Sequence, residues 1–131
     1  MKTRKTILIV DDEEVFGTIL RRLLEKEGYV VSCCNDPYDA VLLSQKRAFD
    51  IIVTDYNMPE MNGADLARLM RYRFADSLIV GLSCETRGSA FLAAGADAFF
   101  PKPIDYRELI SMIKQHKNIL TDRDVQTLIS A

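Results

Sequence analysis

Short apolar runs alternate along the chain with longer segments in which apolar residues recur every three or four positions. Each run has the length of a strand, is rich in β-branched residues and stops at polar or turn residues. The five runs are residues 6–10, 29–34, 51–54, 78–83 and 96–100. Apolar runs bounded in this way are typical of buried strands in a parallel sheet. Five such strands with helices between them predict an α/β domain with helices on both faces of the sheet.

Helical spacing and end signals mark five helices between and after these strands. The first carries six apolar residues at helical spacing between positions 15 and 24. The residues that mark helix ends are Gly28, Asp36-Pro37, Asn62-Gly63, Gly95 and Asp105. Asp36 and Asp105 are typical N-caps, and Glu108 completes a capping box with Asp105. The fourth helix, at about 89–94, is expected to be short.

Polar side chains follow four of the predicted strands at the point where each strand ends. Asp11 and Asp12 follow the first strand, Asp55 the third and Lys102 the fifth, while Ser83 closes the fourth. The carboxyl ends of parallel strands share one edge of a sheet, where open α/β domains bind their ligands. Each residue alone has an ordinary explanation as a helix cap, a turn residue or a solvated charge. Their common position favours a functional site.

Three carboxylates at one edge repel one another, which raises their pKa values unless a cation joins them. Hard oxygen ligands in this number suit Mg²⁺ or Mn²⁺, which keep several waters and accept a phosphoryl oxygen. Lys102 could hold the same phosphoryl group by its charge, and Ser83 could donate a hydroxyl to it. Asp55 could act as the nucleophile and carry an acyl phosphate.

Length, charge and cysteine content lead us to expect one cytoplasmic domain that contacts neither nucleic acid nor a membrane. The chain has 131 residues, and its 17 basic and 19 acidic residues give a net charge of -2. No apolar run approaches the length of a membrane span. Three cysteines, two of them adjacent, argue against a disulfide framework and for a reducing compartment.

The motifs in combination resemble the receiver domain of two-component response regulators, the CheY-like family, over about residues 5–117. The residues that carry the resemblance are Ile7-Leu8-Ile9-Val10-Asp11-Asp12-Glu13, Asp55 with Met58-Pro59 and Asn62-Gly63, Ser83, and Lys102-Pro103. The resemblance implies a flavodoxin-like (βα)5 domain at residues 1–117, doubly wound, with strand order 2-1-3-4-5. It also implies a phosphorylation switch that catalyses only its own phosphorylation and dephosphorylation, and is therefore not an enzyme.

The resemblance assigns a role to each residue at the expected edge of the sheet. It implies that Asp55 is the phosphoacceptor and that Lys102 binds the phosphoryl group. Asp12 and Asp55 would bind Mg²⁺ directly, together with the backbone carbonyl of Asn57. Asp11 would act mainly through a metal-bound water.

Further roles follow from the offsets of this family. Ser83 matches the hydroxyl of the family's switch, and Phe99 matches the aromatic residue that moves with it. Phe100 competes for that role, and strand alternation places the two rings on opposite faces. Asn57 and Glu85, each two residues beyond a site residue, match side chains that flank the hydrolytic water. Their polar and acidic character resembles the chemotaxis type, which implies a short-lived phosphoryl state.

Two features depart from the family pattern. Ser83 and Lys102 are separated by 19 positions, about three fewer than usual in this family and close to the ~3.6 residues of one helical turn. The shortening falls on the fourth helix, part of the face by which most receivers dimerise or contact effectors. Residues 118–131 extend beyond the family's usual end, and the spacing of Val125, Leu128 and Ile129 predicts a short helix that packs on the domain or forms a homodimer.

The resemblance implies a phosphohistidine donor, on a sensor histidine kinase or a histidine phosphotransfer domain, and an unidentified downstream protein. Acetyl phosphate is an alternative donor in the family. Two other functions remain open: a small Mg²⁺-dependent phosphohydrolase with an aspartyl nucleophile, and a receiver-like binding module that is not phosphorylated. A chain of 131 residues leaves no cap domain for the first, and the intact Asp11, Asp12, Asp55 and Lys102 set argues against the second.

Overall fold

The computed structural model describes residues 4–84, 87–118 and 129–130. Five strands form one parallel sheet in the order β2-β1-β3-β4-β5, which confirms the predicted α/β fold. The strands are β1 (Thr6–Val10), β2 (Val30–Cys34), β3 (Ile51–Asp55), β4 (Leu78–Ser83) and β5 (Ala98–Pro101). The helices are α1 (Glu14–Lys26), α2 (Pro37–Lys46), α3 (Gly63–Arg73), α4 (Gly88–Ala93) and α5 (Tyr106–Asn118).

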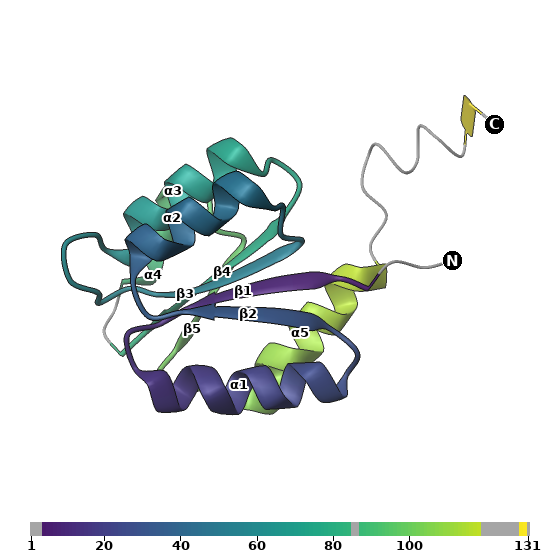
Figure 1. The fold of residues 1–131 in the computed structure, drawn as a ribbon, viewed down its shortest axis with the longest axis horizontal. Coiled ribbons are helices and arrows are strands. Elements are labelled where there is room, and N and C mark those ends of the chain that lie inside the picture. The colour runs from purple at the N-terminus through teal and green to yellow at the C-terminus, as the bar shows by residue number, and fades with distance from the viewer. Residues whose placement is uncertain (1–3, 85–86, 119–128, 131) are drawn as a thin grey trace.

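The sheet separates two hydrophobic cores. Helices α1 and α5 cover one face and α2, α3 and α4 the other (Figure 1). Alternate residues of the central strands enter the two cores, with Ile52 on the α3 side and Val53 on the α1 side. Both residues are fully buried, because a parallel sheet with helices on both faces exposes neither side of its central strands.

The predicted N-caps Asp36 and Asp105 are confirmed, and Asn62, predicted only to precede a helix, caps a third helix. The side chain of Asp36 accepts a hydrogen bond from the amide two residues later at 2.7 Å. Asn62 and Asp105 accept from the amides three residues later, at 2.9 and 3.2 Å. Each bond satisfies one of the amide groups that a helix leaves unpaired at its N-terminus.

Some boundaries and one buried face differ from the prediction. β5 runs over Ala98–Pro101, two residues later than expected at its start, because the amide of Ala96 closes α4 by bonding the carbonyl of Phe91 at 3.0 Å. In α1, Leu20 and Leu24 are fully buried, whereas Val15 and Ile19 are 74% and 43% exposed. Apolar spacing therefore located the helix correctly but overstated the width of its buried face.

The fourth helix has six residues, which confirms that it is short. The helix predicted within residues 118–131 falls mainly outside the described residues, which include only 118 and 129–130 of that segment. Among the described residues, none of the helices has the length and apolar character that a membrane span requires.

Candidate functional site

Three carboxylates meet at the carboxyl edge of the sheet. Asp55 is the last residue of β3, and Asp11 and Asp12 directly follow the neighbouring strand β1. One carboxylate oxygen of each lies within 4.8 Å of the others. Asp11 and Asp55 are only 2% and 4% exposed, whereas Asp12 is exposed. The structure therefore brings together the acidic residues that the sequence placed at one edge.

Lys102 joins this cluster from the segment after β5. Its Nζ lies 3.1 Å from a carboxylate oxygen of Asp55 and 3.3 Å from one of Asp11. Glu13 is a more distant and exposed partner at 3.8 Å. The backbone amide of Lys102 donates to the carbonyl of Ser83 at 2.7 Å, so the β4–β5 pairing fixes where the lysine enters the site.

Burial controls the electrostatics of the cluster. It raises the pKa of Asp11 to about 6, against the opposing hydrogen bond from the Glu13 amide, and the Asp55 carboxylate raises it further. Burial also raises the pKa of Asp55, although Lys102 opposes the shift. For Lys102, burial would lower the pKa, but the carboxylates of Asp11 and Asp55 together outweigh it and raise the pKa. One half-buried lysine thus faces two buried carboxylates.

This donor set fits a hard divalent cation. The three carboxylates supply closely spaced oxygen ligands, and Lys102 compensates only part of their negative charge. The raised pKa values of Asp11 and Asp55 indicate that the ionised cluster needs further positive charge. Oxygen ligands of this kind with one accessible carboxylate suit Mg²⁺, which prefers to retain waters.

The hydroxyl and aromatic candidates lie on the neighbouring strands. Ser83 ends β4 and is fully buried. Phe99 of β5 is 40% exposed, and its ring lies against the backbone of Gly88, where an added Cβ would approach its Cζ to 2.1 Å. Phe100 packs on the core formed with α1 and α5, so the two rings occupy opposite faces. The switch roles of Ser83 and Phe99 remain predictions.

The two residues expected to tune dephosphorylation are placed only in part. Asn57 is exposed, with its side-chain nitrogen 3.8 Å from the sulfur of Cys84, the residue after Ser83. Glu85 lies outside the described residues. The side chain of Asn57 therefore reaches across from the β3 loop to the β4 loop beside the acidic cluster.

Two supports of the site were not predicted from the sequence. Gly63 lies so close to the carbonyl of Asp55 that an added Cβ would be 2.0 Å from that oxygen. The Asn62-Gly63 pair indicated a turn, but the sequence carries no sign of this close approach. The rings of Phe16 and Tyr106 stack at 5.7 Å, and the Lys102 Nζ lies 5.3 Å from the Phe16 centroid. These rings cover one side of the lysine.

Comparison with known proteins identifies the class. Residues 7–114 match the family model of the response regulator receiver domain. The Arabidopsis thaliana protein ARR21, named as a two-component response regulator, is 36% identical over 106 residues, which are 79% of this chain and 17% of that protein. The chain therefore belongs to the receiver-domain family of response regulators, and it spans about a sixth of the length of that relative.

Solved structures agree with this assignment. The chemotaxis response regulator CheY4 of Vibrio cholerae has a TM-score of 0.80 at 28% identity, with 87% of this chain and 99% of that chain covered. A CheY-like receiver domain of Methanospirillum hungatei has a TM-score of 0.81 at 28% identity, over 86% and 93% of the two chains. A BeF3-activated receiver domain, DrrB, has a TM-score of 0.82 at 20% identity over 89% and 100%, which shows the fold alone. The standard function of this class is phosphorylation on an aspartate.

Proposed function

We propose that Asp55 is the phosphoacceptor of this receiver domain. The observation that carries the proposal is the position of its carboxylate, which is 4% exposed, 3.1 Å from the Lys102 Nζ, and grouped with Asp11 and Asp12. Asp12 is exposed, and one carboxylate oxygen of Asp11 already accepts the Glu13 amide. Asp55, at the end of a central strand, is the carboxylate best placed as the nucleophile.

In this reaction Asp55 forms the covalent bond, and the other residues of the site stabilise charge. A carboxylate oxygen of Asp55 attacks phosphorus, the P–N bond of a phosphohistidine donor breaks, and its electron pair stays on the imidazole nitrogen. Lys102, held in the cationic form by its raised pKa, stabilises charge on the phosphoryl oxygens. Asp12, Asp55 and the carbonyl of Asn57, with Asp11 through water, would hold Mg²⁺, which supplies further positive charge for the phosphoryl group.

The surface beside Lys102 fits a protein donor. Val15 and Ile19 of α1 are exposed, and they line a groove with Ile104 and Tyr106 that reaches Lys102 itself. Exposed apolar residues next to a buried polar site are typical of a docking surface. We propose that the phosphohistidine domain of a sensor kinase or phosphotransfer protein packs here.

The free cysteines Cys33, Cys34 and Cys84 are in keeping with transfer in a reducing, cytoplasmic compartment.

Intact-mass measurement after incubation with Mg²⁺ and acetyl phosphate tests the proposal. We expect one added phosphate on the wild-type chain and none on Asp55→Asn. The matched control Asp39→Asn removes an exposed aspartate of α2 and should label as the wild type does. Labelling of Asp55→Asn at the wild-type level would refute the assignment of Asp55.

The same experiment separates the alternative functions. Multiple turnover of phosphate esters would favour a phosphohydrolase, and no labelling of any variant would favour a binding module without phosphorylation. Asn57 lies beside the cluster, and with Glu85 it supports our proposal of a short-lived phosphoryl state. A half-life of many hours on the Mg²⁺-bound protein would contradict that proposal.

A further inference from the structure

The two edge strands of the sheet, β2 and β5, differ in how well they are protected against pairing with another chain. The outer side of an edge strand carries a row of amide and carbonyl groups that can bond a further strand. β5 has only four residues and ends at Pro101, which has no amide hydrogen to donate. Asp97 adds a charge directly before it. Short length, proline and charge all discourage pairing at a sheet edge.

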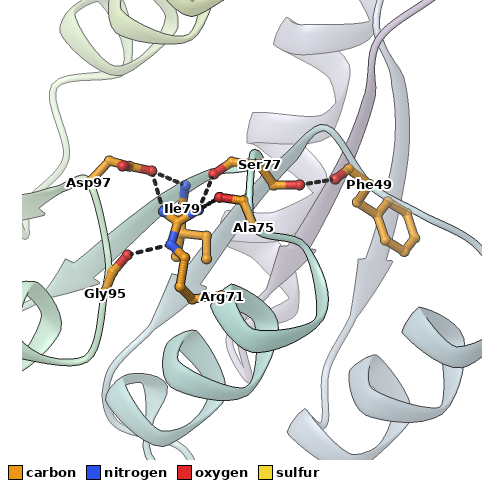
Figure 2. A network of polar contacts seen from close by, with 7 residues as sticks. All are labelled: Phe49, Arg71, Ala75, Ser77, Ile79, Gly95 and Asp97. Atoms are coloured by element: carbon orange, nitrogen blue, oxygen red, sulfur yellow. Dashed lines mark hydrogen bonds and ion pairs between the residues drawn. The ribbon is translucent and has the colours of Figure 1, made fainter. Parts of the chain in front are cut away.

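The charge at the start of β5 is held in place by other parts of the chain (Figure 2). The carboxylate of Asp97 forms an ion pair with Arg71 of α3 at 2.7 Å and accepts the amide of Ile79 at 2.8 Å. Arg71 also donates to the carbonyl of Gly95 at 2.9 Å. Asp97 is therefore a fixed feature of this edge.

The opposite edge, β2, has none of these features. From Tyr29 to Asn35 the sequence contains no charged residue, proline or glycine. Figure 1 shows β2 at the edge of the sheet, with α1 on one face and α2 on the other, and among the described residues it pairs with β1 alone. Val30 of this strand is 41% exposed. An uncharged strand with an open side is a template for pairing with another chain.

The hydrogen bonds to β1 determine which backbone groups of β2 face outward. The amide of Val30 donates to the carbonyl of Lys5 at 3.0 Å, and the carbonyl of Cys34 accepts the amide that follows β1 at 3.1 Å. Residues of a strand direct their backbone groups alternately to its two sides. The amides and carbonyls of Val31 and Cys33 therefore point to the open side.

The helices beside β2 carry opposite charges at their two ends. The groove between α1 and β2 is lined by Glu14, Arg22 and Cys33, among others. Glu14 lies in the first turn of α1, Arg22 follows about two turns later, and both are exposed. On the other face, α2 has exposed Asp39 in its first turn and exposed Lys46 in its last. Both helices thus place acid beside the carboxyl end of β2 and base beside its amino end.

This distribution of charge is self-complementary under two-fold symmetry. An axis perpendicular to the sheet makes two β2 strands antiparallel and sets each helix beside the same helix of a second copy. The acidic end of each helix then faces the basic end of its counterpart. The sulfur of Cys33 lies 3.7 Å from the carbonyl oxygen of Gly17, which is close to the midpoint between Glu14 and Arg22. An axis near Cys33 therefore aligns both the strands and the charges.

We propose that the open edge of β2 binds a second copy of this chain, with the two β2 strands paired antiparallel about a two-fold axis near Cys33. The outward groups of Val31 and Cys33 join the two sheets into one. Glu14 of each copy faces Arg22 of the other.

The interface leaves the proposed donor groove beside Lys102 open. That groove and the groove between α1 and β2 have no lining residue in common. The face formed by α4 and β5 lies at the opposite edge of the sheet. The inference does not depend on the proposed function, and it allows each copy to be phosphorylated separately.

Sedimentation equilibrium of the full chain over a range of concentrations tests the interface, and the wild type should form a dimer. Glu14→Arg sets like charges opposite each other in both helix contacts, and so does Arg22→Glu. Each should raise the Kd of the dimer at least about tenfold. The variant with both substitutions restores opposite charges between the copies, so its Kd should return to within about threefold of the wild-type value.

The rescue by the double variant is specific to contact between copies. Residues 14 and 22 of one chain are about 12 Å apart along the helix and do not meet within it. Arg107→Glu is the matched control, because it makes the same charge reversal at an exposed residue of α5, and it should leave the Kd unchanged. A wild type that stays monomeric at every concentration, or a double variant as weak as the single ones, would overturn the proposal.

Amide hydrogen exchange resolved by NMR shows whether the strands themselves pair. The amides of Val31 and Cys33 point outward, whereas those of Ser32 and Cys34 face β1. From a dilute to a concentrated sample, exchange should slow at least about tenfold at the outward amides and less than about threefold at the others.

Two results of this experiment would contradict the proposal. Slow exchange of Val31 and Cys33 in the dilute, monomeric sample would show that the chain covers its own edge. Fast exchange of these amides in a dimeric sample would place the interface elsewhere on the molecule.

Discussion

The edge of the sheet that carries the proposed acceptor Asp55, here called the acceptor edge, and the face formed by α4 and β5 are built in opposite ways. At the acceptor edge, Asp11 and Asp55 are buried and paired with the half-buried Lys102 at 3.3 and 3.1 Å, and the backbone fixes their positions. On the other face, Phe99 is 40% exposed and lies on a glycine of a six-residue helix.

This difference places phosphoryl transfer and the conformational response in separate parts of the domain. Phosphoryl transfer requires charged groups that hold their positions before the donor arrives, since reorganisation would add to the barrier. A conformational response requires groups that can occupy two positions at similar free energy. The buried edge meets the first requirement, and the half-exposed ring of Phe99, which lies against Gly88, meets the second. The following predictions test this contrast.

Gly63→Ala should have the largest effect on stability. Its Cβ would lie 2.0 Å from the carbonyl oxygen of Asp55, which belongs to the backbone of a central strand and has little freedom to move. We expect a loss of at least about 3 kcal/mol in the free energy of unfolding, the upper part of the range for overpacked sites. Urea denaturation measures it.

Gly17→Ala is the matched control for this prediction. It makes the same substitution in α1, where the nearest atom to the new Cβ is the Cys33 sulfur at 4.0 Å. Helix propensity predicts a gain of up to about 1 kcal/mol for Gly17→Ala. Equal stabilities of the two variants would show that the approach of Gly63 to Asp55 is unimportant.

The acceptor edge should also destabilise the metal-free protein at neutral pH. The pKa of Asp11 is raised to about 6 in the folded protein from 3.8 for an unperturbed aspartate, so between these values the folded state binds more protons than the unfolded state. Stability therefore falls as pH rises through this window, by up to about 3 kcal/mol at ~1.4 kcal/mol per pH unit. Asp11→Asn should lack this loss, and its side-chain oxygen can still accept the Glu13 amide.

The free energy of unfolding of the wild type and of Asp11→Asn is to be measured from pH 4 to pH 7 with a metal chelator present. The difference between the two proteins isolates the contribution of the Asp11 carboxyl from that of other titrating groups. The variant should become the more stable protein as pH rises. Mg²⁺ should reduce or reverse the difference, since it binds the ionised cluster of the wild type. A difference that does not vary with pH would contradict the assignment.

Two glycine-to-alanine substitutions compare the core with the responding face. In Gly81→Ala the new Cβ would lie 2.4 Å from the fully buried ring of Phe91, and we expect a loss of about 1–3 kcal/mol. In Gly88→Ala the obstacle is Phe99, which can rotate into solvent, so the loss should stay below about 1 kcal/mol. Equal losses in urea denaturation would remove the contrast between these regions.

Local patterns in the sequence accounted for most of the fold. The β-branched run that ends at Asp55 was correctly predicted as a strand, and Asp36, Asn62 and Asp105 begin helices as expected. Patterns of this kind depend on residues close together in the chain, so they can be read directly. The exposure of Val15 and Ile19 could not be predicted from the sequence, because it depends on where α1 lies on the sheet.

The sequence by itself determined the strands, the helices, the shortness of α4 and the set of Asp11, Asp12, Asp55, Ser83 and Lys102, since residue type and spacing carry that information. Tertiary structure alone decided which atoms meet. The contact of Arg71 with Gly95 and Asp97, the approach of Gly63 to Asp55 and the seating of Phe99 on Gly88 join segments far apart in the chain or in different elements. Such contacts leave no local pattern, because they depend on the packing of whole elements.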